Sequence, residues 1–260
     1  IAVLGGGAVG KTCAADMKLA GSEVRLYDAM PFAETSLKDL DKTGILFDGV
    51  QRNRDCFERS GRAFLDVVTT DMAEAVKGAG QIVVACCSWG HEPMFRALIP
   101  HLEDGQVVNV FADNFGCLLL RRMMREMECT KKIIVGGWSS APYGTRIESI
   151  GKFQFPHVSA KYRAITLRGA ALPMTDTDDF LEASRYLPCM DAVTQGDGPS
   201  KANTILDVDF ANVNPVIHVP ATILGVSTME NWGVIFCGHD KTTYSMYSHG
   251  LCPSICEVQY

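Results

Sequence analysis

The stretch Ile1-Ala2-Val3-Leu4-Gly5-Gly6-Gly7-Ala8-Val9-Gly10 decides the fold. Its first four residues are apolar and predict a buried parallel strand, and the glycines that follow have the spacing G-x-G-x-x-G. We expect Gly5 to make a tight turn, Gly7 to let a pyrophosphate approach the backbone, and Gly10 to let a helix lie close to the strand. A glycine-rich turn in some other βαβ unit is the alternative interpretation.

The residues after the glycines complete a βαβ unit. Residues 11–20 carry apolar side chains at helical spacing, and Gly21 ends that helix. Residues 23–28 predict a second strand, which ends in Asp28, 18 residues after Gly10. Asp28 can accept hydrogen bonds from both hydroxyls of an adenosine ribose and would repel a 2′-phosphate. No arginine follows it, so the sequence favours NAD over NADP as the cofactor.

Composition excludes several classes of protein. The chain has 260 residues, of which 47% are hydrophobic and 21% charged, as in an ordinary globular protein. A net charge of −6 without a basic cluster argues against nucleic acid and membrane surfaces as partners. The ten cysteines include no C-x-x-C pair. Reduced thiols of a cytoplasmic protein are therefore favoured over disulfides or a zinc site at Cys252 and Cys256.

The pattern along the rest of the chain predicts an α/β fold. Further strands are expected at residues 44–50, 64–69, 81–87, 106–111, 133–137 and 161–167, and helices at 72–77, 94–102, 117–127 and 176–186, the first of them capped by Asp71. The arginine-rich residues 51–62 are interpreted as a solvated excursion. We predict a doubly wound, mainly parallel Rossmann domain over residues 1–175 and a mainly helical substrate or catalytic domain over residues 176–260.

Polar side chains follow several of these strands at their carboxyl ends, where an open α/β sheet binds ligands. Ser88 follows the strand at 81–87 and is expected to line the cofactor site together with Gly5, Gly7, Ala8, Val9, Gly10 and Asp28. His91 is a candidate catalyst nearby, but a capping or cofactor-contacting role is favoured. Asn114 follows the strand at 106–111. Thr145 lies in residues 138–146, which are interpreted as a loop suited to a small polar substrate.

A later segment, Asn212-Val213-Asn214-Pro215-Val216-Ile217-His218, resembles the opine dehydrogenase family, the octopine and nopaline dehydrogenases and their relatives. The glycine turn, the segment Pro142-Tyr143-Gly144-Thr145-Arg146 and residues 247–254 support the same resemblance. It implies an oxidoreductase acting on CH–NH groups. In enzymes of this family an amino acid and a 2-oxo acid condense, and the reduced cofactor reduces the resulting imine to a secondary amine.

The resemblance also implies roles for individual residues. His218 would be the general acid and base, which suits an imidazole because its ordinary pKa lies near neutrality. A structural role is the alternative for this histidine. Asn114 and Thr145 are candidates for binding the substrate carboxylate or carbonyl. Asn214 would orient His218 or bind substrate, although capping is the commoner role for an asparagine at a helix start.

One departure from the family pattern concerns the partner of the histidine. The family pairs it with an aspartate well downstream, but only 42 residues follow His218 and Asp240 is their only aspartate. We therefore expect this sequence to be part of a longer protein. The oligomeric state is left open, a homodimer included.

Two other functions compete with an opine dehydrogenase. A ketopantoate reductase or a glycerol-3-phosphate dehydrogenase would use a second-domain lysine, for which Lys201 is better placed than Lys241. A dinucleotide-binding sensor without turnover would fit the missing acid. A turnover assay with each substrate separates these alternatives.

Overall fold

A computed structural model describes residues 1–49, 59–150, 153–195, 198–215, 219–220 and 223. The chain divides into two compact units, Ile1–Asp209 and Phe210–Tyr260. The architecture below is that of the first unit, which contains the glycine turn.

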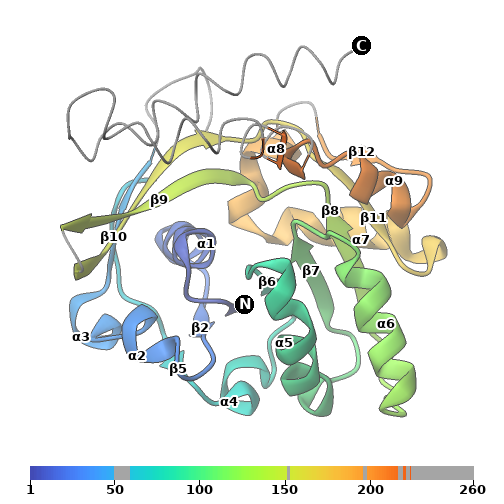
Figure 1. Cartoon of the computed structure of the whole chain (residues 1–260), viewed down its shortest axis with the longest axis horizontal. Coiled ribbons are helices and arrows are strands. Elements are labelled where there is room, and N and C mark those ends of the chain that lie inside the picture. Colours follow the sequence, from blue (N-terminus) through green and yellow to red (C-terminus); the bar gives the residue numbers. More distant parts are fainter. Residues whose placement is uncertain (50–58, 151–152, 196–197, 216–218, 221–222, 224–260) are drawn as a thin grey trace. The chain divides into compact units, whose positions relative to one another are not determined.

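An eight-stranded sheet runs through the first unit in the order β12-β11-β8-β7-β6-β1-β2-β5 (Figure 1). Its strands are β1 (Ala2–Leu4), β2 (Arg25–Tyr27), β5 (Val67–Thr69), β6 (Gln81–Val84), β7 (Val107–Phe111), β8 (Ile134–Trp138), β11 (Arg168–Ala171) and β12 (Ser200–Lys201). All neighbours from β5 to β8 pair in parallel, whereas β11 is antiparallel to β8. The parallel part has the strand order of a doubly wound dinucleotide-binding fold, so the predicted Rossmann architecture is confirmed.

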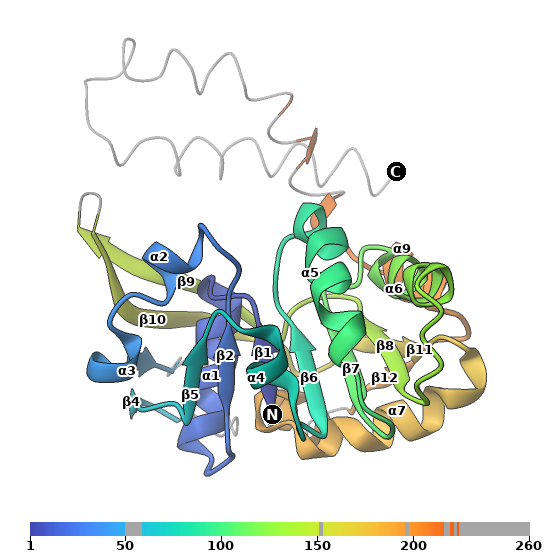
Figure 2. The same cartoon turned by 90° about the horizontal axis from the view of Figure 1, so that it is seen from below.

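Helices cover both faces of this sheet, as Figures 1 and 2 show. One face carries α4 (Met72–Val76), α5 (His91–Leu98), α6 (Gly116–Glu126) and α9 (Ile205–Phe210), whose apolar side chains share one core cluster. The other face carries α1 (Ala8–Leu19), α7 (Thr177–Ala183) and α8 (Asp191–Gln195), whose buried side chains belong to a second cluster. The central strands β1, β6 and β7 are buried on both faces, which explains their continuous apolar sequence.

A second sheet covers α1 on the side away from the large sheet. The chain leaves the large sheet after β2, forms α2 (Ala33–Ser36), α3 (Leu40–Thr43), β3 (Ile45–Asp48) and β4 (Gly61–Ala63), and returns at β5. Strands β3 and β4 join β9 (Tyr143–Ile150) and β10 (Phe153–Arg163) in the order β4-β3-β10-β9. Because α1 lies between the two sheets, every residue from Gly10 to Met17 is buried.

The second sheet corrects two predictions. Residues 143–146 belong to β9 rather than to a loop, because the ring of Tyr143 and the hydroxyl of Thr145 are buried in the core. Of the strand predicted at 161–167, only residues 161–163 are in a strand, at the end of β10, and residues 164–167 connect β10 to β11, which begins at Arg168. Both segments contain polar residues that pair inside the core, and this hides the alternation expected of a half-buried strand.

The large sheet continues beyond residue 175, where the sequence placed a domain boundary. Strand β12 pairs with β11, and Ile205 and Val208 of α9 join the core cluster of α5 and α6. The first compact unit therefore ends at Asp209. The extent of a helical substrate domain stays a prediction, since most residues after Asn214 lie outside the described part of the chain.

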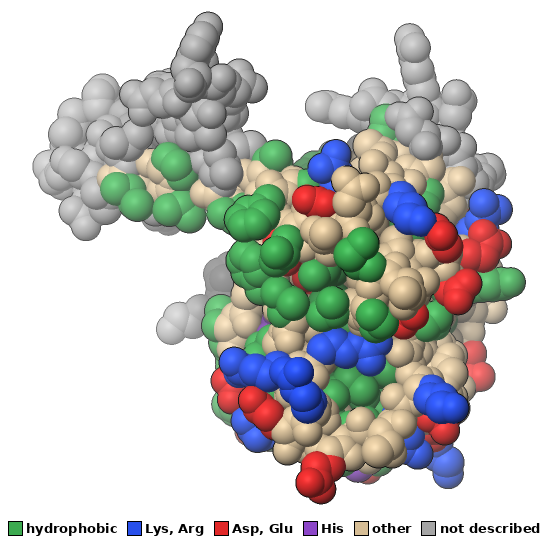
Figure 3. Space-filling view, turned by 90° about the vertical axis from the view of Figure 1, so that its right-hand side faces the viewer, with side chains coloured by type: hydrophobic (Ala, Val, Ile, Leu, Met, Phe, Trp, Pro, Cys, Tyr) green, Lys and Arg blue, Asp and Glu red, His purple; other side chains and the backbone are tan. Residues whose placement is uncertain are grey.

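The outer side of α6 and α9 carries exposed apolar groups. Leu118 of α6 is 38% exposed and Leu206 of α9 is 43% exposed. Figure 3 looks at this side and shows hydrophobic side chains gathered beside basic ones.

None of the described helices combines the length and the apolar character that a membrane span requires.

Candidate functional site

The glycine turn has the geometry that its spacing predicts. Gly5 has a φ of +119°, and a Cβ there would lie 2.6 Å from the carbonyl oxygen of Ala85. A Cβ on Gly10 would lie 1.7 Å from the carbonyl oxygen of Gly5, so only glycine lets α1 approach the turn. A Cβ on Gly7, in contrast, would meet no atom within 4 Å. The turn is closed toward the fold and open at the residue expected to face a pyrophosphate.

The first turn of α1 offers backbone donors to an anion. Its N-cap is Gly7, which has no side chain to accept from the first N–H groups, and no acidic residue lies in that turn. Ala8 and Val9 are half-buried there and Gly10 is buried. These residues, with Gly5 and Gly7, fit a pyrophosphate bound through backbone N–H groups.

Asp28 lies at the carboxyl end of β2, beside the glycine turn. Its Oδ2 accepts a hydrogen bond from Ser36 Oγ of α2 at 2.5 Å, and its Oδ1 accepts one from the backbone of Ala29 at 3.0 Å. A Cβ on Gly6 would lie 2.8 Å from both Asp28 Oδ2 and Ser36 Oγ. The carboxylate is thus fixed directly against the turn, in the position expected of a ribose-binding acid.

The carboxyl ends of β6 and β7 meet on the other side of β1. Ser88 follows β6 in a short 3₁₀ turn (Ser88–Gly90), and its Oγ accepts a hydrogen bond from Asn114 Nδ2 at 3.3 Å. The structure therefore brings two predicted site residues together. Exposed aromatic rings extend this edge, because Trp89 packs on Phe32, the residue before α2, with ring centroids 5.8 Å apart.

Two buried acids hold the turn that carries Asn114. Asn114 and Phe115 both have left-handed backbone conformations, with φ of 45° and 64°. Asp113 Oδ1 accepts from the backbone N–H of Cys117 at 2.8 Å, and Asp209 Oδ1 accepts from that of Phe115 at 2.8 Å. Both carboxyls therefore bind the N-terminal end of α6, from β7 and from α9.

The same two acids also interact with each other. Asp113 is 1% exposed and Asp209 is 8% exposed, and within the described part of the chain the Oδ2 of each has no hydrogen-bonding partner other than the opposing carboxyl. Burial, opposed by the hydrogen bonds with Cys117 and assisted by the charge of Asp209, raises the pKa of Asp113 to about 7. Burial also raises the pKa of Asp209. A pair sharing one proton satisfies these contacts. Sequence reasoning missed Asp209, since nothing local marks it.

His91 is placed for packing rather than catalysis. It is 1% exposed at the start of α5, where its ring packs on Phe95 with centroids 5.3 Å apart. A Cβ on Gly116 of α6 would lie 2.9 Å from its Nδ1. Burial lowers the pKa of His91, which favours a neutral imidazole between the two helices.

Thr145 is also part of the interior. It is 4% exposed, its Oγ1 lies 2.7 Å from Thr12 Oγ1 of α1, and it donates to the carbonyl of Ser159 at 3.1 Å. A hydroxyl engaged in this way joins α1 to the second sheet. This position favours a structural role over the predicted contact with substrate.

The arginine-rich segment contains one residue that is not solvated. Arg59 binds Asp16 of α1, with Nε 2.7 Å from Oδ1, and its Nη1 lies 2.8 Å from Asp191 Oδ2 of α8. Asp16 is fully buried and also accepts from Arg163 and from the hydroxyl of Tyr143. The solvated interpretation is therefore wrong for Arg59, because a buried carboxylate on α1 requires cations. Arg52 and Arg54 lie outside the described residues.

The residues of the second unit are described only in part. Asn214 donates to Asn212 Oδ1 from its backbone N–H at 3.1 Å and from its side chain at 2.8 Å, an arrangement that starts a helical turn. His218, Asp240, Lys241, Cys252 and Cys256 lie outside the described residues. Lys201, the alternative lysine, lies in the first unit, where its Nζ forms an ion pair with Asp178 at 2.5 Å on the surface.

Comparison with known proteins shows which proteins this chain resembles. A family model for the α-helical domain of NAD/NADP octopine/nopaline dehydrogenases matches residues 201–260. The opine dehydrogenase of Arthrobacter sp. (strain 1C) is 26% identical over 258 residues, which are 98% of this chain and 62% of that enzyme. The resemblance to the opine dehydrogenase family is confirmed.

Solved structures related to the opine dehydrogenase family have the same fold. An octopine dehydrogenase with NADH and L-arginine has a TM-score of 0.65 at 20% identity and covers 91% of this chain. A yersinopine dehydrogenase with NADP⁺ has a TM-score of 0.65 at 14% identity and covers 88% of this chain. A ketopantoate reductase from Ralstonia eutropha JMP134 has a lower TM-score of 0.53. The chain spans 55% of the octopine dehydrogenase and 53% of the yersinopine dehydrogenase.

Proposed function

We propose that this protein is an NAD(H)-dependent oxidoreductase of the opine dehydrogenase type. It would reduce the imine formed from an amino acid and a 2-oxo acid, or oxidise the corresponding secondary amine. The observation that carries this proposal is the glycine turn, which is sealed at Gly5 and Gly10 and open at Gly7. The family resemblance over residues 201–260 supports the choice of reaction.

The proposed cofactor is NAD, with NADP as the less favoured alternative. Backbone N–H groups of Gly7, Ala8 and Val9 would bind the pyrophosphate, and Asp28 would accept from the ribose hydroxyls. Ser88 and Asn114 would line the continuation of the site across β6 and β7, toward the nicotinamide. The cofactor, when bound, supplies or removes a hydride. NADH in the octopine dehydrogenase structure and NADP⁺ in the yersinopine dehydrogenase structure support a nicotinamide cofactor.

The protein's own part in the reaction is to orient the substrates and to move one proton. Asn114 stands on a turn fixed by Asp113 and Asp209, so its amide can hold a substrate carboxylate or carbonyl in one orientation. His218 would exchange the proton with the amine or imine nitrogen, and Asn214 would orient it. Small amino and oxo acids are the proposed partners, since octopine dehydrogenase structures contain L-arginine in one case and pyruvate in another.

A substrate-omission assay tests this proposal in the purified protein. NADH oxidation should require a 2-oxo acid and an amino acid together. Oxidation with the oxo acid alone would favour a reductase of the ketopantoate type, and NADH binding without turnover would favour a sensor. His218→Ala should lower turnover about a hundredfold or more while leaving NADH affinity nearly unchanged. Unchanged turnover would give His218 a structural role.

A further inference from the structure

Lys11 is a buried cation beside the glycine turn whose role is not explained by packing. It directly follows Gly10 in α1 and is 2% exposed. Among the described residues its ammonium forms no hydrogen bond and no ion pair, and its nitrogen is not among the fully enclosed polar atoms, so it keeps a small contact with solvent. Burying an unpaired ammonium is costly, so a fold tolerates one where something else supplies its counter-charge.

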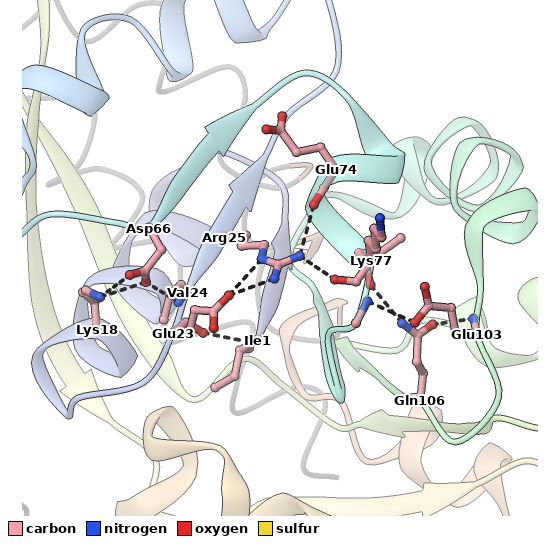
Figure 4. A network of polar contacts seen from close by, with 12 residues as sticks. Ile1, Lys18, Glu23, Val24, Arg25, Asp66, Glu74, Lys77, Glu103 and Gln106 are labelled. Atoms are coloured by element: carbon pink, nitrogen blue, oxygen red, sulfur yellow. Dashed lines mark hydrogen bonds and ion pairs between the residues drawn. The ribbon is translucent and has the colours of Figure 1, made fainter.

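The direction of Lys11 follows from the helix that carries it. Lys18 lies two helical turns further along the same face of α1 and binds Asp66, the residue before β5, at 2.7 Å (Figure 4). That face of α1 therefore points toward the β2–β5 edge of the sheet. Because the helix begins at the carboxyl ends of the strands, Lys11 lies on the same side at the end where Asp28 follows β2.

The electrostatics agree with this placement. Burial lowers the pKa of Lys11 to about 8, and the charge of Asp28 opposes that change. The carboxylate of Asp28 is therefore close enough to interact with the charge of Lys11. The hydrogen bonds that it accepts come from Ser36 and Ala29 and not from the ammonium. A lysine of this kind gains most from a multiply charged anion, and the nearest donors for such an anion are the free N–H groups of the first turn of α1.

We infer that Lys11 is a cofactor-binding residue whose ammonium contacts a phosphate group of the dinucleotide. This inference rests on the proposed function, and it adds a side-chain cation to a site otherwise built from backbone and one acid. The phosphate is either the pyrophosphate, which both dinucleotides carry, or a 2′-phosphate beside Asp28. In the second case Lys11 offsets the repulsion from Asp28 and admits NADPH.

Lys11→Met tests the inference because it removes the charge and keeps a long apolar side chain in a buried position. The matched control is Lys18→Met, which removes a charge from the same face of the same helix away from the turn. Dissociation constants for NADH and NADPH are measured by calorimetry, together with those for 5′-AMP and 2′-AMP as probes of the two phosphate positions. Thermal unfolding shows that each variant is folded.

The expected result is a loss of about tenfold or more in affinity for at least one dinucleotide in Lys11→Met and little change in Lys18→Met. Equal losses for NADH and NADPH identify the pyrophosphate, and a loss confined to NADPH and 2′-AMP identifies the 2′-phosphate. Wild-type affinity should also fall as the pH rises through about 8, a dependence that Lys11→Met lacks. Unchanged affinities in Lys11→Met would overturn the inference and leave the proposed function standing. A wild-type protein that binds neither dinucleotide would overturn both.

Discussion

Two groups of buried acids stabilise this fold in opposite ways. Asp16 of α1 is surrounded by cations and a hydroxyl, since Arg59, Arg163 and Tyr143 all bind it. Among the residues that the structure describes, no cation is paired with Asp113 or Asp209, and these acids instead accept N–H groups at the start of α6. The first group needs its full negative charge, whereas the second is compatible with only one charge for two carboxyls.

The first group of acids belongs to the structural framework, and the second lies beside the proposed substrate site. The Asp16 group joins α1 to the second sheet and to α8, and it contains none of the residues predicted to bind cofactor or substrate. The Asp113–Asp209 pair fixes the backbone of Asn114 at the edge of the sheet that we propose for substrate binding. We therefore expect a loss of charge to be severe in the first group and tolerated, or even favourable, in the second.

The largest effect is expected for Asp16→Asn. The substitution keeps the shape but removes the carboxylate that Arg59 and Arg163 share, and breaking a buried ion pair by removing one partner costs roughly 3–5 kcal/mol. Urea denaturation at neutral pH measures the free energy of unfolding. A change below about 1 kcal/mol would mean that water or rearranged partners compensate the arginines, and the contrast between the two groups would fail.

A smaller effect of opposite sign is expected for Asp113→Asn, and it depends on pH. Because burial raises the pKa of Asp113 to about 7 in the folded protein, the native state binds more protons than the unfolded state between about pH 4 and 7. Wild-type stability should therefore fall by roughly 2–4 kcal/mol as the pH rises through this window.

The asparagine variant should lose most of that slope and gain stability relative to wild type above pH 7, since its amide can still accept from Cys117 and donate to Asp209. Unfolding curves at several pH values between 4 and 8 measure both slopes. Parallel slopes in the two proteins would show that the pair does not share a proton.

The smallest effect is expected for Lys18→Met, which breaks an exposed ion pair and so extends the comparison from buried acids to the surface. Lys18 and Asp66 are 27% and 34% exposed, and Asp66 also accepts from the backbone of Val24 (Figure 4). Solvent screens such a pair, so its loss should lower the free energy of unfolding by about 1 kcal/mol or less. A loss as large as that of Asp16→Asn would mean that exposure does not determine the strength of ion pairs here.

The sequence predicted the parts of the fold that depend on local pattern. The glycine turn, the strands β1, β6 and β7 and the cap of α4 by Asp71 all follow from neighbouring residues, and each is confirmed. The second sheet was only partly predicted, because β9 and β10 carry polar groups whose partners lie on α1. The acids around Asn114 could not be predicted, since Asp209 meets Asp113 only after the whole first unit has folded.

The second sheet has one more consequence, for the tolerance of α1 to change. Most helices that flank an open sheet keep one face in water, where substitutions are nearly neutral. Here an unbroken run from Gly10 to Met17 is enclosed by protein on every side. A scan that substitutes each residue of this helix in turn should therefore find no position, at any point of the helical repeat, where substitutions are neutral. Residues 10–17 would then be among the segments of the chain that tolerate the fewest substitutions.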